Sequence, residues 1–319
     1  MLAFLTIIAL TALYPTPAVL ADNEIRVLEQ LVEGYPDWTP RGIVDVGANK
    51  GGWTTSIQTK VFPNQRIPTF MVEASPQHQQ ELDKVKERFP HVIYKIAVLS
   101  GVDGDKVQFF GKGGTGDSMF REQSQHYDGI RPEVRTTLKL DTLVTHMEHI
   151  DYLKIDVQGA ELMVLQGATE TLKRATFVQM EASAVGYNQG GACWFDLDVF
   201  MRQHGFYFYD SADYFRHPLA FHTKGIGQFD VLYVRPTSEH MPQWLKDANV
   251  SFCGSNRANE ATGGAKLLHG TMEDDTTART LATGTTLLMG FFATFLFGYF
   301  AGKGTRFMGL SISQGRKHG

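Results

Sequence analysis

Glycines and carboxylates that follow predicted strands are the residues of this sequence best suited to chemistry. A short β-branched run ends at Asp45, and three glycines crowd the turn after it, at Gly47, Gly51 and Gly52. Glycine lets the backbone approach a ligand closely, and a helix that begins after such a turn presents free N–H groups. We therefore predict a strand, a tight loop and a helix start at 44–53, with a nucleotide-like ligand bound there. An ordinary glycine-rich turn is the alternative on spacing alone.

Two further stretches strengthen this interpretation. The sequence IPTFMVEASP at 67–76 is typical of a buried strand, and its Glu73 stands where an acidic residue binds a ribose diol. The sequence YLKIDVQGAELMVLQGA at 152–168 predicts a strand that ends at Asp156, followed at once by a helix with Glu161 in its first turn.

Together the three stretches resemble the S-adenosylmethionine-dependent methyltransferases of the FkbM type. DVGANKG followed by VEASP is a general class I methyltransferase pattern, whereas KIDVQGAELMVLQGA resembles the hallmark of the FkbM family itself. The resemblance covers roughly residues 40–235 and implies S-adenosylmethionine as cofactor. It further implies cofactor-binding roles for Asp45, Gly47, Asn49, Gly51 and Glu73. The family usually has an acid where this chain has Gln158, so no carboxylate role is transferred to that position.

Asp156 and Glu161 are the candidate catalytic residues. An oxygen acceptor loses its proton during methyl transfer, so Asp156 could act as the base or orient the sulfonium end of the cofactor. Its alternative role is to cap the helix that begins near Gly159. Glu161 lies in a first helical turn, where the helix dipole alone favours a negative charge. Asp156, Glu161 and Glu181 could also gather a magnesium ion, but nothing in their spacing requires one, and no metal site is predicted.

The acceptor side of the site is less distinct in the sequence. The glycine-rich segment at 113–120, together with His126 and Tyr127, lies between two predicted strands and could form a lid over the acceptor. A simple flexible loop is the alternative.

Composition and charge exclude some classes of function. The 319 residues carry a net charge of −4 without long blocks of one sign, which disfavours a nucleic-acid substrate. Cys193 and Cys253 are the only cysteines and lack metal-ligand spacing, so a zinc site is not expected. They could form one disulfide outside the cytosol or remain two thiols.

Both ends of the chain differ from the middle. Residues 1–21 combine an apolar run with small residues before Asp22 and predict a cleaved signal peptide, with an uncleaved anchor as the alternative. We predict a polar stalk at 246–280, a transmembrane helix at 281–301 and a basic tail at 302–319. The positive-inside tendency then places the tail in the cytosol and the catalytic head in the lumen or outside the cell.

The middle, residues 22–245, is predicted as one α/β domain. Strands alternate with helices, which favours a Rossmann-like, mostly parallel sheet with helices on both faces, and the resemblance implies seven strands with one reversed. One of the last two strands, FYFYD or FDVLYVR, would be the reversed member. Ligands of such sheets bind at the carboxyl ends of the strands. One shared site is therefore expected at the four strand-end acids, Asp45, Glu73, Asp156 and Glu181.

The expected activity is methyl transfer from S-adenosylmethionine to a hydroxyl, most plausibly on a sugar or other small glycoconjugate. Two other classes remain open. A glycine turn and a strand-end acid also suit an NAD-dependent oxidoreductase, although GANKGG lacks the full spacing of that fingerprint. A membrane-anchored binding module without catalysis is the second alternative, and Gln158 is the feature that favours it.

Overall fold

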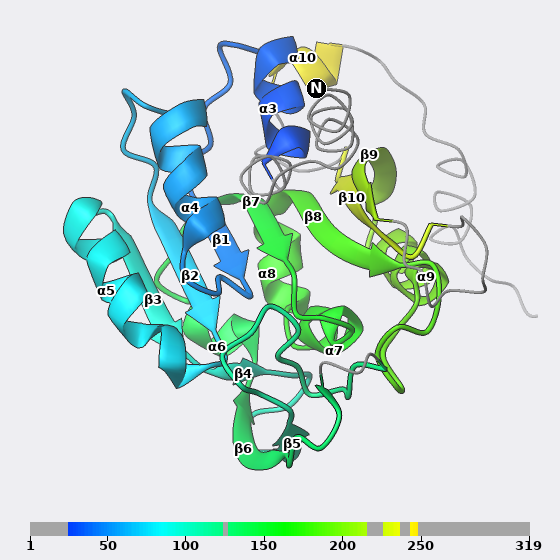
Figure 1. Cartoon of the computed structure of the whole chain (residues 1–319). Coiled ribbons are helices and arrows are strands. Elements are labelled where there is room, and N and C mark those ends of the chain that lie inside the picture. The colour runs from blue at the N-terminus through cyan, green and yellow to red at the C-terminus, as the bar shows by residue number, and fades with distance from the viewer. Residues whose placement is uncertain (1–24, 124–126, 216–225, 237–242, 248–319) are drawn as a thin grey trace, which may run out of the picture. The chain divides into compact units, whose positions relative to one another are not determined.

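The fold is described from a computed structural model of the chain. It covers residues 25–123, 127–215, 226–236 and 243–247 (Figure 1). The predicted signal peptide, membrane helix and basic tail, nearly all of the predicted stalk, and also His126 and Cys253, lie outside these residues. Within them, no helix is both long and apolar enough to cross a membrane.

Seven strands form the central sheet in the order β3-β2-β1-β7-β8-β10-β9 (Figure 1). Their bounds are β1 Ile43–Val46, β2 Thr69–Glu73, β3 Val92–Ile96, β7 Ile150–Ile155, β8 Ala175–Ser183, β9 Tyr207–Phe215 and β10 Gln228–Val234. The pairs among the first five strands of this order are all parallel, whereas β10 pairs antiparallel with both of its neighbours. The predicted mostly parallel sheet is thus confirmed, and β10 is its reversed strand.

Helices cover both faces of this sheet because strand residues alternate between two apolar cores. Val44 and Val46 belong to a core shared with α6 Leu140–Leu143, α7 Glu161–Gln166, α8 Thr169–Arg174 and α9 Trp194–Gln203. Ile43 faces the other side and packs with α3 Arg26–Gly34, α4 Gly52–Ser56 and the π-helix Ile57–Val61. The remaining part of that side is covered by α5 Gln79–Arg88, which follows the short 3-10 turn Pro76–His78. A last short helix, α10, spans Gln243–Asp247.

The amphipathic pattern at the start of the domain forms α3. Ile25, Leu28 and Leu31 recur at helical spacing, and all three side chains are buried under the sheet. This helix packs against β9, far along the chain, and so joins the two ends of the domain. A short helix thus precedes the first strand, as this spacing predicts.

The sequences KVQFFG and EVRTTLKL, within 106–140, predict strands, and β5 Lys106–Phe109 and β6 Glu133–Leu138 confirm them. With β4 Val98–Leu99 these strands form a separate three-stranded sheet, which was not predicted. The sequence also predicts one helix from near Gly159 to about Leu172, and this prediction needs correction. The helix is broken into α7 and α8 at Gly167, where the Ser100 carbonyl approaches so closely that a Cβ would overlap it.

Candidate active site

A cavity of ≈ 1080 Å³ opens at the carboxyl ends of the parallel strands. Its walls come from the loop after β1, the ends of β2, β7 and β8, the segment after β5 and the pair β9 and β10. Such a volume holds a cofactor-sized ligand. The cavity lies where the parallel-sheet argument expected a ligand.

The glycine loop after β1 forms one wall of the cavity. Gly47 and Gly51 have φ of +81° and +73°, and Asn49 also has a positive φ of 51°. A Cβ at Gly47 would overlap the carbonyl oxygen of Asp156, so only glycine lets the loop pass this close to β7. The N–H groups of Gly47 and Ala48 both donate to the carbonyl of Val72, at 2.9 and 3.0 Å. The loop is therefore a fixed cradle between β2 and β7.

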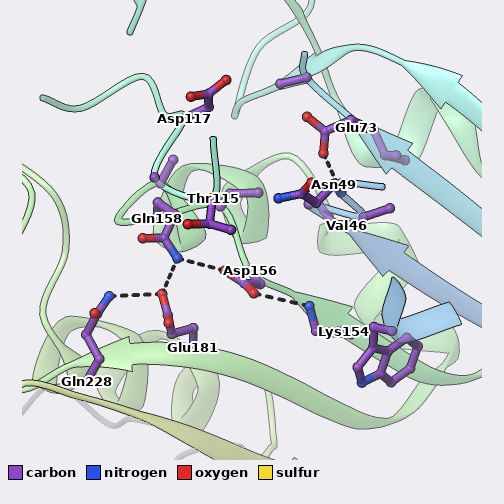
Figure 2. A pocket seen from close by; sticks show the side chains of 18 of the residues that line it. Val46, Asn49, Glu73, Thr115, Asp117, Lys154, Asp156, Gln158, Glu181 and Gln228 are labelled. Atoms are coloured by element: carbon purple, nitrogen blue, oxygen red, sulfur yellow. Dashed lines mark hydrogen bonds and ion pairs between the residues drawn. The ribbon is translucent and has the colours of Figure 1, made fainter. Parts of the chain in front are cut away.

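Glu73 ends β2 and lies beside this loop (Figure 2). Its Oε2 accepts the Asn49 N–H at 2.6 Å, and its Oε1 accepts the Ser75 N–H at 2.7 Å. Burial raises the pKa of Glu73, while these two N–H donors oppose the shift. Each carboxylate oxygen has a further lone pair, so the fixed side chain can still accept the two hydroxyls of a ribose.

Asp45 takes a supporting position. Its side chain is fully buried and is not among the residues that line the cavity. The carboxylate accepts the Thr54 hydroxyl at 2.7 Å and lies 3.9 Å from the ammonium of Lys154. Asp45 thus ties β1 to the start of α4 and to β7. The cofactor-binding role of Asp45 stays a prediction. Because its side chain does not line the cavity, Asp45 would affect cofactor binding by holding the glycine loop in place.

Asp156 follows β7 directly, and its carboxylate lines the cavity. Lys154 Nζ lies 3.2 Å from Oδ2, and Gln158 Nε2 donates to Oδ1 at 3.1 Å (Figure 2). The N-cap residue of α7 is Ala160, with no side-chain cap bond, so Asp156 does not cap that helix. Two neighbours orient its carboxylate without removing it from the cavity.

Glu161 has a different place from Asp156. Its side chain is 2% exposed and is not among the cavity-lining residues. Its Oε1 accepts the N–H groups of Val157 and Gly159, at 3.0 and 3.1 Å. Burial raises the pKa of Glu161 to about 7, against the effect of these donors. Glu161 holds the turn after Asp156 together, which is a structural task, and its predicted catalytic role stays a prediction.

Sequence reasoning did not foresee how Gln158 is used. Its backbone has a positive φ of 55°, and its amide nitrogen donates both to Asp156 and, at 2.6 Å, to Glu181 Oε2 (Figure 2). Gln228 from β10 donates to the same Glu181 oxygen at 3.0 Å. Position 158 stood out in the sequence because it departs from the family pattern. Its contacts could not be predicted, because Gln158 follows β7, Glu181 lies in β8 and Gln228 lies in β10, and only the folded sheet brings them together.

The segment 113–120 lines the cavity, as a lid would. Asp117 organises it by accepting the N–H groups of Lys112, Gly113 and Gly114 at 3.0, 2.8 and 3.1 Å. Ser118 donates its hydroxyl to the carbonyl of Gln158 at 2.8 Å, which ties the segment to the turn after Asp156. Tyr127 is buried beneath it and donates to Asp117 at 2.9 Å.

Carboxylates outnumber basic groups among the described lining residues. Seven acidic side chains face three basic ones, which are Arg26, Lys50 and Lys154. Burial favours the protonated form of Glu181 and Asp230, which leaves five acids against three basic groups. This excess suits a cofactor that carries a sulfonium and an ammonium group. Among the described residues, no three acidic, histidine or cysteine side chains are grouped so that they could hold a metal ion.

The strand order, the single reversed strand and the glycine loop together define a Rossmann-like methyltransferase fold. Residues 45–208 match the family described as "Methyltransferase FkbM domain". The chain belongs to this family of S-adenosylmethionine-dependent methyltransferases, and S-adenosylmethionine is its cofactor. No curated protein matches the chain.

Solved structures with a similar fold are distant in sequence. The FkbM methyltransferase from Methylobacillus flagellatus KT has 15% identity and a TM-score of 0.38, over 61% of this chain and 43% of that one. Magnesium protoporphyrin IX methyltransferase from Synechocystis PCC 6803 has 8% identity and a TM-score of 0.40, over 68% and 81%. Fibrillarin from Aeropyrum pernix has 12% identity and a TM-score of 0.38, over 66% and 74%. The chain thus spans less than half the length of the Methylobacillus protein, and nothing specific to these proteins is transferred to it.

Proposed function

We propose that the chain methylates a hydroxyl group of a sugar or small glycoconjugate, with Asp156 as the base. The observation behind this proposal is the position of Asp156. Its carboxylate is exposed to the cavity and is oriented by Lys154 and Gln158, and its backbone carbonyl lies against the cofactor loop at Gly47.

The lining residues fit S-adenosylmethionine. Gly47 and Asn49 line the cradle, and Glu73 offers two fixed oxygens to the ribose hydroxyls. Gly51 does not line the cavity, and its positive φ shapes the loop from the side of α5. The bound cofactor supplies the electrophilic methyl group. Because Glu73 and Asp156 lie on opposite sides of this loop, a cofactor held by both loop and Glu73 can direct its reactive end toward β7 (Figure 2).

Asp156 would then act on the acceptor. When the acceptor oxygen takes the methyl group that the bound cofactor would supply, the Asp156 carboxylate would receive the hydroxyl proton. Gln158 and Lys154 hold that carboxylate by one oxygen each, so it need not reorganise during the reaction. Holding the acceptor hydroxyl in line with the methyl group lowers the activation barrier further, by on the order of 7 kcal/mol or more in well-oriented systems.

The test is Asp156→Asn. The amide keeps the size of the side chain and loses the ability to take a proton, so turnover should fall by about 10² or more while cofactor affinity stays within about twofold. Titration calorimetry gives the affinity, and transfer of a tritiated methyl group to a glycoside panel gives the turnover. Lost cofactor binding with normal turnover in the remaining folded enzyme would contradict this role. A binding module would bind the cofactor and transfer no methyl group.

We also propose that the catalytic head is membrane-tethered and lies outside the cytosol. The support is the apolar segment at 281–301, the apolar run at 1–21 and the basic residues that follow the former. A cytosolic source of S-adenosylmethionine opposes this arrangement, because a lumenal enzyme needs the cofactor imported.

A further inference from the structure

Glu181 adjoins Asp156 in the cavity, and the mechanism above does not use it. Both carboxylates accept from the single nitrogen Nε2 of Gln158, at 2.6 Å to Glu181 and 3.1 Å to Asp156 (Figure 2). Gln158 and Gln228 both donate to Oε2 of Glu181, and within the described part of the chain no hydrogen bond ends on Oε1. One oxygen of Glu181 therefore stays available to hydrogen-bond a ligand that also reaches Asp156.

The wall around Glu181 alternates carboxylates with amides. Asp230 is the cross-strand partner of Glu181 in the β8–β10 pair, and Gln179 donates to it at 2.7 Å. Each acid is thus held in place by a glutamine and still lines the cavity. Hydroxyl groups both donate and accept hydrogen bonds, so they are the natural partners of such a wall.

An anionic acceptor does not suit this wall. Burial raises the pKa of Asp230 to about 8 and the pKa of Glu181 well above its usual range, and the charge of Asp156 adds to both shifts. A carboxylate or phosphate on the acceptor would add one more negative charge to a site where negative charge is already unfavourable. The nearest cation, Lys154, already pairs with Asp156.

An amine acceptor does not suit it either. An amine reacts through its lone pair, which is free only when the nitrogen is unprotonated. The Asp156 carboxylate nearby stabilises the ammonium form and raises the pKa of the amine, so the reactive form would become scarcer in this cavity. An uncharged hydroxyl has neither disadvantage.

Flat apolar side chains complete the acceptor end of the cavity. Tyr214 and Phe229, from β9 and β10, line it, and their rings stack at 5.9 Å between centroids. A ring with hydroxyls on its rim and C–H groups on its faces can hydrogen-bond to the residues around Glu181 and pack against these aromatic side chains at the same time.

We propose that Glu181, held by Gln158 and Gln228, binds a second hydroxyl of the acceptor next to the one that Asp156 receives. The substrate class is then an uncharged polyhydroxylated ring with two adjacent hydroxyls. This inference rests on the proposed function and adds Glu181 and Gln228 as specificity residues.

The experiment uses the full chain, tritiated S-adenosylmethionine and probes that differ in one property. The methyl glycosides of glucose, mannose and galactose present both cis and trans pairs of adjacent hydroxyls on a hexose ring. Methyl glucuronide adds a negative charge, methyl glucosaminide adds an amine, and cyclohexanol has one hydroxyl alone. At least one neutral glycoside should exceed the other three probes at least tenfold in kcat/KM.

Glu181→Leu and Gln228→Leu separate the inference from the proposed function. Each should raise KM for that glycoside about tenfold or more, with cofactor affinity within about twofold and little change in kcat. Glu170→Leu, at an exposed glutamate on α8, is the matched control and should change nothing. Unchanged KM in both variants, or cyclohexanol as good as the glycosides, overturns the inference alone. Cofactor binding without transfer to any hydroxyl overturns the proposed function as well.

Discussion

Asp156 and Glu161, five residues apart in the stretch 152–168, have different surroundings, because Asp156 lines the cavity and Glu161 is buried away from it. The sequence offered Asp156 and Glu161 as one candidate pair, because both stand near a strand end and a helix start. The left-handed residues Gln158 and Gly159 between them turn the chain so that Glu161 accepts backbone N–H groups and Asp156 faces the cavity. Residue type alone could not assign these directions, because they depend on a two-residue turn conformation.

Glu73 offers the clearest prediction for a single cofactor-binding residue. Glu73→Ala would remove the proposed acceptor for the two ribose hydroxyls and would also free the Asn49 N–H that Glu73 holds. Charge-assisted hydrogen bonds are worth roughly 1.5 to 3 kcal/mol each, so affinity for S-adenosylmethionine should fall at least about tenfold. Titration calorimetry measures it, with exposed Glu170→Ala as the control. An affinity equal to that of the parent chain would remove Glu73 from the site.

At the scale of elements, the strands around the site were the most predictable part of the fold. Apolar runs that end in an acid or a glycine marked β1, β2 and β7, because buried strands of a parallel sheet are continuously apolar. The sheet of β4, β5 and β6 was not foreseen, since its β5 and β6 are largely exposed and have no such pattern. The break between α7 and α8 was missed because it depends on the approach of Ser100 from another loop.

The loop after β1 gives a prediction at this scale. Gly47→Ala forces a Cβ into the Asp156 carbonyl at a positive φ, so the loop must move. The left-handed conformation alone costs about 1 to 2 kcal/mol for a residue with a Cβ. We expect stability to fall by at least that amount in urea unfolding and cofactor binding to be lost. Gly34→Ala, where a Cβ would meet nothing within 4 Å, should leave both nearly unchanged. Cofactor affinity retained in Gly47→Ala would show that the loop is not the cradle.

The turn held by Glu161 predicts a pH dependence of stability. Burial raises the pKa of Glu161 from 4.5 to about 7, so the folded chain keeps a proton that the unfolded chain releases in this window. The folded state then binds more protons, and the free energy of unfolding should decrease as the pH rises from about 4.5 to 7. At 1.36 kcal/mol per unit, the loss from this residue is on the order of 3 kcal/mol.

Glu161→Gln tests this loss. The variant cannot release a proton, so the decrease in unfolding free energy between pH 5 and pH 8 should shrink by a few kcal/mol relative to the parent chain. Urea unfolding at the two pH values measures it, and Glu170→Gln should keep the full decrease. An equal decrease in Glu161→Gln and the parent would mean that Glu161 is ionised at both pH values.

At the scale of the whole molecule, the sequence supported the order of layers but not the contents of the site. Alternating strands and helices led to a parallel sheet, and the family resemblance led to the reversed strand that β10 supplies. The hydrogen bonds that Gln158 and Gln228 donate to Glu181 could not be predicted, because these residues lie after β7, in β10 and in β8. Such long-range side-chain contacts follow from the assembled sheet and leave no local pattern.

The proposed topology is a property of the whole chain. If the head is lumenal, sealed microsomes from a eukaryotic host should protect it from protease, and detergent should abolish that protection. Asn249-Val250-Ser251 is a glycosylation acceptor sequence, so the chain should also carry a glycan that Asn249→Gln removes. Digestion of the head without detergent would contradict this topology.

The most direct test of the whole account is titration calorimetry of the full chain with S-adenosylmethionine, with NAD in a parallel cell. The cradle at Gly47, the paired oxygens of Glu73 and the excess of carboxylates in the cavity predict saturable binding of S-adenosylmethionine at one site per chain. NAD should give no measurable heat at the same concentration. Saturable NAD binding, or no binding of S-adenosylmethionine by a folded chain, would contradict the account.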